Sequence, residues 1–122
     1  MMVSVGEMID RLTILLLKQA HGALVEDELR VYAEGLCEDD LWGKAWVQKE
    51  FLELFFVNAA IWQLEWQVRQ GREGELSLEE IGRRALAIRD LNAQRVAAKN
   101  RLASATGGYR EQKIDHASED TP

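Results

Sequence analysis

Eight polar residues, grouped in three stretches of the chain, have side chains that could do chemistry together. They are Glu7, Asp10, Asn58, Glu65, Arg69, Asn92, Arg95 and Lys99. The arginines and the lysine could bind an anionic group, and the carboxylates could orient that group or hold a divalent cation. The acids and the bases among them are equal in number, so the same residues could instead form a network of ion pairs.

Each of these residues lies on a predicted helix face that also carries apolar side chains, at 100° per residue. The apolar residues that share those faces are Val3, Ile14, Leu17, Phe51, Leu54, Ile61, Trp62, Ile81, Ala85, Ile88, Val96 and Leu102. We therefore predict that the eight polar residues converge in one cluster inside a helical bundle. Two hypotheses stay open for this cluster: a buried network that fixes helix register, or a pocket for a small anionic ligand.

The paired acids Glu7 and Asp10 raise an enzymatic alternative. Residues at i and i+3 project similarly and can share one hard cation, as in half of the acidic arrangement of magnesium-dependent all-α nucleotide pyrophosphohydrolases. Glu50 and Glu53 have the same spacing but project to a different side, which predicts a solvated stripe. The sequence assigns no catalytic residue, no metal ligand and no cofactor.

The helices that must position these residues are marked by capping signals. Ser4 with Glu7, and Ser77 with Glu80, are capping boxes that open helices over about 5–20 and 77–105. A short helix is expected over 23–35, with Leu24, Leu29 and Tyr32 available for packing. From Asp39 or Asp40, an acidic cap, a third helix should run to Gly71.

These elements predict an all-α fold. The third and fourth helices should form a long antiparallel hairpin, with the first helix packed on it, buried on two sides, and a short second helix beside it. We expect one helical domain over 1–106 and a polar tail over 107–122 that is flexible or docked through one short contact.

A second candidate surface is aromatic. Trp42 and Trp46 are spaced by four positions, and Trp42 groups roughly with Phe56 on the face of the third helix opposite the polar residues. One short second helix does not suffice to cover that reverse face. Trp42, Trp46 and Phe56 are therefore predicted to form an interaction surface, most economically the interface of a symmetric homodimer.

Composition excludes several classes of function. The net charge of −6 and the lack of a basic run oppose nucleic-acid binding. The richest apolar stretch, from Phe51 to Trp62, is too short to cross a bilayer, so we expect no membrane insertion. We expect no secretory signal, and the single cysteine, Cys37, fits a reducing compartment, which predicts a cytoplasmic protein.

The sequence resembles an uncharacterised bacterial all-helical family, a domain of unknown function often encoded near surface-glycan glycosyltransferases. The residues that carry the resemblance are Gly6-Glu7, Asp10-Arg11-Leu12-Thr13-Ile14-Leu15, Asn58, Ile61-Trp62, Leu64-Glu65, Arg69, Leu91-Asn92, Arg95, Lys99-Asn100, Glu111 and Lys113. The family pattern has acids where this chain has Leu16, Trp66 and Ala93. The resemblance implies a helical fold and no specific activity.

These observations favour a noncatalytic helical interaction or accessory module, a homodimer or the partner of another protein. The alternative is a small all-α protein that binds an anionic ligand, or hydrolyses a nucleotide with magnesium, through the polar cluster.

Overall fold

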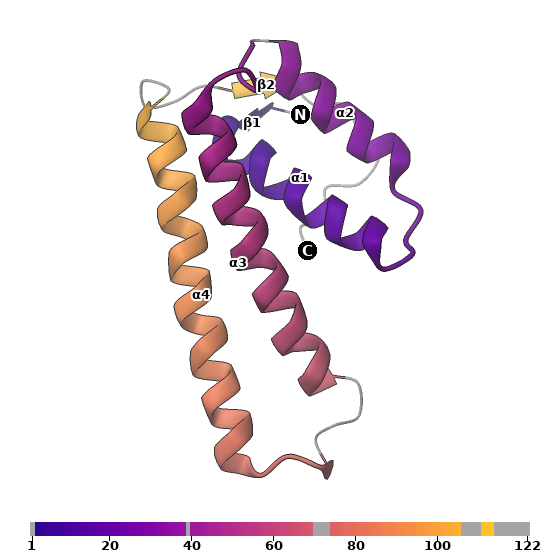
Figure 1. Cartoon of the computed structure of the whole chain (residues 1–122), viewed down its shortest axis with the longest axis vertical. Helices are drawn as coiled ribbons and strands as arrows, with labels where there is room; N and C mark the ends of the chain where they lie inside the picture. Colours follow the sequence, from indigo (N-terminus) through magenta and orange to yellow (C-terminus); the bar gives the residue numbers. More distant parts are fainter. Residues whose placement is uncertain (1, 39, 70–73, 106–110, 114–122) are drawn as a thin grey trace.

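The computed structural model describes residues 2–38, 40–69, 74–105 and 111–113. Its elements, in chain order, are β1 (Met2–Ser4), α1 (Val5–Ala20), α2 (Glu26–Glu38), α3 (Ala45–Arg69), α4 (Leu78–Ala105) and β2 (Glu111–Lys113). The four helices pack as a bundle, which confirms the predicted all-α class (Figure 1).

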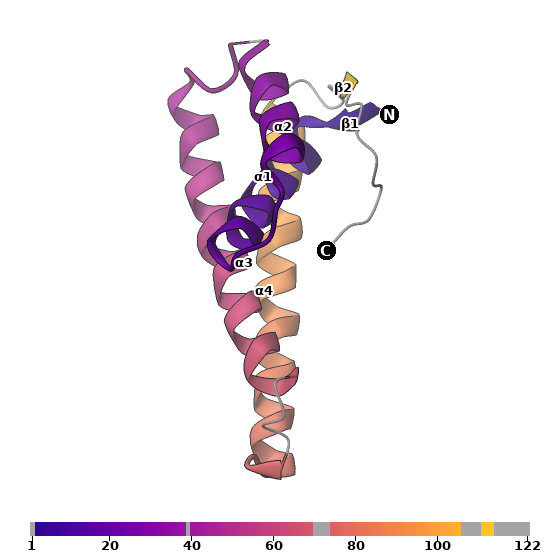
Figure 2. The same cartoon turned by 90° about the vertical axis from the view of Figure 1, so that its right-hand side faces the viewer.

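The bundle is built on an antiparallel hairpin of α3 and α4, as predicted. Helix α1 lies across one side of this hairpin and contacts both helices, and α2 packs on α1 (Figures 1 and 2). The core consequently centres on α1, whose Met8 and Ile9 are wholly buried. The expectation that this helix is buried on two sides is confirmed.

Both predicted capping boxes start helices. Ser4 Oγ accepts a hydrogen bond from the Glu7 backbone N–H at 3.2 Å, and Ser77 Oγ accepts one from Glu80 at 3.1 Å. The Glu80 carboxylate accepts from the Ser77 N–H in return, at 3.4 Å, whereas the Glu7 carboxylate pairs with Lys99 instead. The ends of α1 and α4 match the predicted ranges.

The predicted start of the third helix at Asp39 or Asp40 is wrong, because α3 begins at Ala45. Asp40 has a positive φ of 55°, which lies outside the right-handed helical region, and Leu41 is wholly buried as an anchor for the turn. Trp42 therefore lies in a turn, and helical spacing does not relate it to the residues of α3.

Helix α2 begins and ends three residues later than predicted, at Glu26 and Glu38. Gly35 does not end the helix but lies buried within it. Leu24 precedes the helix and is 100% exposed, so its expected packing role is wrong. Tyr32 is buried and Leu29 packs against the core, as expected.

A short antiparallel ribbon adds to the helices near the start of α1. Strand β1 pairs with β2, and Met2 and Ser4 oppose Lys113 and Glu111. Part of the predicted tail is thus docked through one short contact. The other tail positions, 107–110 and 114–122, lie outside the described residues.

The lower part of the hairpin extends beyond α1 and α2 (Figures 1 and 2). We call this part the distal hairpin: residues 62–69 of α3 and 78–91 of α4. None of these residues is buried, although several are apolar. In the described part of the chain, every helix is either too short or too polar to cross a membrane.

Candidate functional site

Asp10 is the centre of the polar cluster. Its carboxylate is wholly buried, on the side of α1 that faces the hairpin. Arg95 from α4 donates through Nε to Oδ1 at 2.9 Å and through Nη2 to Oδ2 at 2.6 Å, which makes a bidentate ion pair. Lys99 Nζ lies 3.8 Å from Oδ2. The burial of this acid is therefore compensated by two cations from α4.

Asn58 joins α3 to the same carboxylate. Its Nδ2 donates to Asp10 Oδ1 at 2.9 Å and to Thr13 Oγ1 at 2.8 Å. Thr13 Oγ1 donates in turn to the backbone carbonyl of Asp10 at 2.7 Å, so it can only accept from Asn58. A carboxylate likewise only accepts, and the two contacts together fix which side of the Asn58 amide is nitrogen.

Glu7 extends the cluster toward the start of α1. Lys99 Nζ lies 2.9 Å from Glu7 Oε2, and Arg11 lies 3.9 Å from the other carboxylate oxygen. Arg11 also donates to the Tyr32 hydroxyl at 3.1 Å, which ties the cluster to α2. Gly6 allows this geometry because α1 and α4 nearly touch there: a Cβ at Gly6 would lie 2.8 Å from the Lys99 carbonyl oxygen.

The electrostatics of the pair keep Arg95 charged. Burial alone would lower the pKa of Arg95, but the hydrogen bond and the negative charge of Asp10 outweigh it, and the pKa is raised. The negative charges of Glu7 and Glu65 act in the same direction. The guanidinium charge is thus neutralised by acids of the same chain.

A cleft adjoins the cluster where α1, α3 and α4 meet. It has a volume of about 230 Å³, and its lining residues are Ile14, Leu17, Asn58, Ile61, Trp62, Glu65, Asn92 and Arg95. We call it the polar cleft. Trp62 stacks on His21, with ring centroids 4.8 Å apart and an interplanar angle of 9°, which holds the indole at the end of α1.

The predicted cluster residues therefore divide into three groups. Five of them, Glu7, Asp10, Asn58, Arg95 and Lys99, are joined by direct contacts. Glu65 and Asn92 line the adjoining cleft. Arg69 is placed at the surface, with its side chain 74% exposed and 3.6 Å from Glu65. Thr13 was not singled out, although it shares a face with Glu7 and Asp10.

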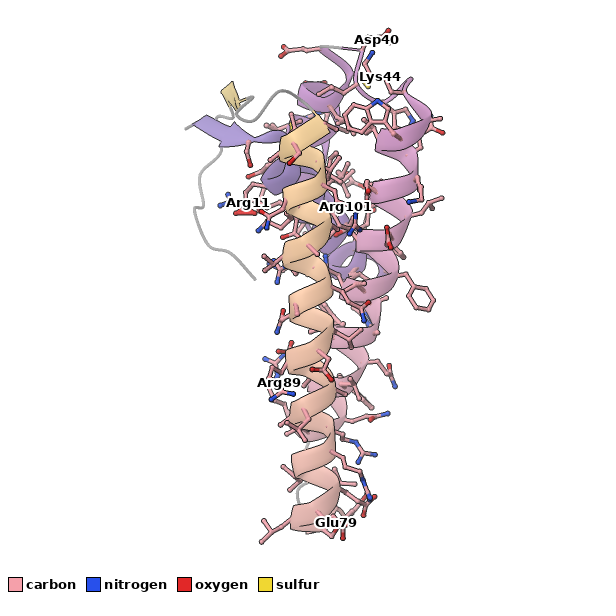
Figure 3. The ribbon with its side chains drawn as sticks, turned by 90° about the vertical axis from the view of Figure 1, so that its left-hand side faces the viewer. Arg11, Asp40, Lys44, Glu79, Arg89 and Arg101 are labelled. Atoms are coloured by element: carbon pink, nitrogen blue, oxygen red, sulfur yellow. The ribbon has the colours of Figure 1, made fainter. Side chains whose placement is uncertain are left out.

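The sequence did not predict a second ion pair, between the buried carboxylate of Glu50 and the half-exposed Arg101. Glu50 is only 7% exposed, and Arg101 donates to it through Nε at 2.9 Å and Nη2 at 3.0 Å. Arg101 also reaches Glu53 at 3.0 Å, and Figure 3 shows it extending from α4 toward α3. The prediction that Glu50 and Glu53 form a solvated stripe is wrong for Glu50, because α4 supplies a cation at that position.

The Glu50–Arg101 pair predicts a pH-dependent stability. The hydrogen bond from Arg101 lowers the pKa of Glu50 below 4.5, against the effect of burial. The stabilisation is complete above that value and is lost as the pH falls through the lower folded-state pKa. We expect Glu50→Gln to cost about 1–3 kcal/mol near neutral pH and less at about pH 3. Urea unfolding at both pH values measures this difference.

Glu53→Gln is the matched control for that prediction. The Glu53 side chain is 47% exposed, so its loss should cost under about 1 kcal/mol at either pH. Equal costs for the two variants, or a Glu50→Gln cost that does not fall with pH, would contradict the assignment.

The acids that suggested cation binding are already bound by side chains of the chain itself. Glu7 pairs with Lys99, and Asp10 pairs with Arg95 and Lys99. A divalent cation would have to displace these amines and guanidinium groups. Among the described residues, no three histidine, cysteine or acidic side chains come together in a way that could hold a metal ion.

The three predicted interface residues have different surroundings. Trp42 is 38% exposed and makes an edge contact with Phe51, with ring centroids 5.1 Å apart. Trp46 is partly buried and packs against the core, so it offers less surface than Trp42, and its place in an interface stays a prediction. Phe56 is 75% exposed and its neighbour Leu52 is 65% exposed. Because Trp42 precedes α3, the residues of this surface follow tertiary packing and not helical spacing.

An apolar groove of about 260 Å³ lies between α1, α2 and α3. Its lining residues are Leu12, Leu16, Leu29, Ala33, Leu36, Cys37, Trp42 and Phe51. Phe55 stacks on Phe51 at the groove, and Leu52 and Phe56 follow on the outer side of α3. We call the groove together with Leu52, Phe55 and Phe56 the aromatic face.

Comparisons with protein-family models, with curated proteins and with solved structures gave no match to this chain. The family resemblance drawn from the sequence therefore stays a prediction.

Proposed function

We propose that this protein is a noncatalytic helical interaction module of the cytoplasm and that it forms a homodimer through the aromatic face. The observation that carries the proposal is the exposure of Phe56 at 75% and of Leu52 at 65%. Both residues lie on the exposed side of α3, the helix that also supplies Phe51 to the apolar groove. Large apolar side chains that are exposed together are typical of interaction sites.

The shape and charge of the aromatic face favour a second copy as the partner. The groove is concave, and Phe56 is exposed on α3, the helix that supplies Phe51 to the groove. In a two-fold arrangement, the projecting residues of each copy could enter the groove of the other. The residues that line the face carry no charge. The groove itself can therefore be covered without burying like charges, although each copy carries a net charge of −6.

The contacts of the polar cluster support a structural role for it in this module. Asp10 binds groups from α3 and α4, and each contact requires one relative placement of the three helices. The alternative, a protein that binds an anion or hydrolyses a nucleotide with magnesium, needs free cations or free carboxylates. Both carboxylates, Asp10 and Glu7, are already bound by cations of the chain itself, which offers less support for it.

The homodimer predicts a clear result for Phe56→Glu. A charge at the centre of an apolar interface should weaken association by about thirtyfold or more, the effect of losing an interface hot spot. Multi-angle light scattering after gel filtration should give the mass of a dimer for the wild type and of a monomer for the variant. Circular dichroism should show unchanged helix content, because Phe56 is exposed.

Leu52→Glu and Leu86→Glu form a matched pair for the same experiment. Leu52 belongs to the aromatic face, whereas Leu86 is 52% exposed on α4. We expect Leu52→Glu to dissociate the dimer and Leu86→Glu to leave it intact. A monomeric wild type would reject the homodimer, and dissociation by Leu86→Glu alone would reject this face.

A further inference from the structure

We propose that the polar cleft binds a small neutral ring compound that presents a hydrogen-bond donor next to an acceptor beside an apolar surface. The edge of a nucleobase and a pair of neighbouring sugar hydroxyls both have this chemistry. The cleft lies between α1, α3 and α4 and shares no lining residue with the aromatic face. The proposal is therefore independent of the homodimer.

Asn58 supplies a fixed acceptor. The residue is only 5% exposed, and its Nδ2 already donates to Asp10 and Thr13. No donor in the described part of the chain reaches Oδ1, which belongs to a residue that lines the cleft. Among the described residues, Arg11 alone leaves a buried side-chain donor or acceptor without a partner, so Asn58 Oδ1 is open to solvent at the cleft, where a ligand that donates an N–H or O–H can replace water.

Arg95 supplies a fixed donor on α4. Its Nε and Nη2 are held by Asp10, which orients the planar guanidinium. Within the described residues its Nη1 has no acceptor, and the same is true of the side-chain amide of Asn92 one turn away. Glu65 adds an acceptor from α3. The cleft thus offers both donors and acceptors, and two of the residues that supply them, Asn58 and Arg95, are held by Asp10 before any ligand arrives.

The remaining wall is apolar. Ile14 and Leu17 from α1 and Ile61 and Trp62 from α3 line it. The stacking of Trp62 on His21 keeps the indole in place. A ring with an apolar surface can lie against this wall while its polar edge faces Asn58 and Arg95.

Size and charge argue for a neutral single ring. The volume of about 230 Å³ lies below the range of roughly 300–1,000 Å³ that is typical of sites for drug-sized molecules. The charge of Arg95 is neutralised by Asp10, and that of Lys99 by Glu7. No surplus positive charge is left in the cleft to hold a phosphate group, which disfavours a whole nucleotide.

Titration by two-dimensional NMR of the ¹⁵N-labelled full chain tests this proposal. The signals to follow are the Trp62 indole N–H and the Asn58 side-chain amide. The probes are cytosine and uracil, then methyl glucoside and methyl galactoside, and inorganic phosphate. We expect at least one neutral ring to shift both signals with a Kd of about 1 mM, and phosphate to shift neither.

Each result of the titration either supports or overturns the proposal. Shifts with the bases alone identify a base edge as the ligand chemistry, and shifts with the glycosides alone identify a pair of hydroxyls. No shift with any neutral ring overturns the proposal. A stronger response to phosphate than to every neutral ring also overturns it, because the site would then be an anion site.

Variants separate the cleft from the rest of the surface. Asn92→Ala and Glu65→Ala remove polar groups of the cleft that make no hydrogen bond with Asp10, and each should weaken binding about tenfold. Asn100→Ala is the matched control on α4, because Asn100 is exposed outside the cleft. Equal effects of Asn92→Ala and Asn100→Ala would overturn the proposal. Repeating the titration with Phe56→Glu keeps the result separate from the oligomeric state.

Discussion

Arg95→Met is expected to destabilise the protein by about 3–5 kcal/mol, as removing one partner of a buried ion pair does. The Asp10 carboxylate is wholly buried and receives a bidentate bond from Arg95. Methionine fills a similar volume without the charge. Asn58 and the more distant Lys99 would be left to balance the carboxylate alone. Urea unfolding followed by circular dichroism measures the loss.

Arg69→Met is the control for that change. Arg69 is 74% exposed and pairs only loosely, at 3.6 Å, with Glu65. Its removal should cost less than about 1 kcal/mol. If Arg95→Met were as mild as Arg69→Met, or stabilising, the Asp10 network would not hold the helices together. That result would favour an anion-binding role for the arginine.

Gly6→Ala should destabilise the protein by about 1–3 kcal/mol, the usual cost of overpacking. The added Cβ would lie 2.8 Å from the Lys99 backbone carbonyl oxygen, which has no rotamer to move. Helices α1 and α4 would have to separate, and the Lys99 contacts with Glu7 and Asp10 would lengthen. Thermal or urea unfolding reports the change.

Gly82→Ala should instead raise the free energy of unfolding. Gly82 lies within α4, and nothing lies within 4 Å of a Cβ built there. Alanine is the better helix former by roughly 0.5–1 kcal/mol, so this variant should be more stable than the wild type. A stabilising Gly6→Ala would show that α1 and α4 do not approach as closely as described.

The sequence predicted the start of a helix correctly where a nearby side chain caps the backbone N–H groups. The serines at positions 4 and 77 satisfy free N–H groups within a few residues, so the starts of α1 and α4 are readable without tertiary information. The start of α3 is not readable in this way. The buried Leu41 and the positive φ of Asp40 hold a turn at a place where an acidic cap alone would allow a helix.

The candidate site was predictable where a polar residue interrupts an apolar stripe. That rule placed Asp10, Asn58 and Arg95 on faces that turn inward. The same rule did not predict the ion pair between Glu50 and Arg101. The pattern of α3 gives the direction of the Glu50 side chain, but it does not show which face of α4 lies opposite. The prediction that Arg69 joins the cluster is wrong for a related reason. Arg69 lies in the last turn of α3, beyond the reach of α1 (Figure 1).

Helices α3 and α4 are packed against the rest of the protein along only part of their length. Leu54 and Leu102 anchor the upper part of the hairpin in the core, whereas the distal hairpin contains no buried residue. Segments with few buried contacts open locally at a lower free energy than the rest of the fold. Trp62 and Asn92 lie at this boundary, so a molecule bridging them would restrict the opening of the turns below. A ligand in the cleft would then reduce the motion of the lower ends of α3 and α4 without changing their structure.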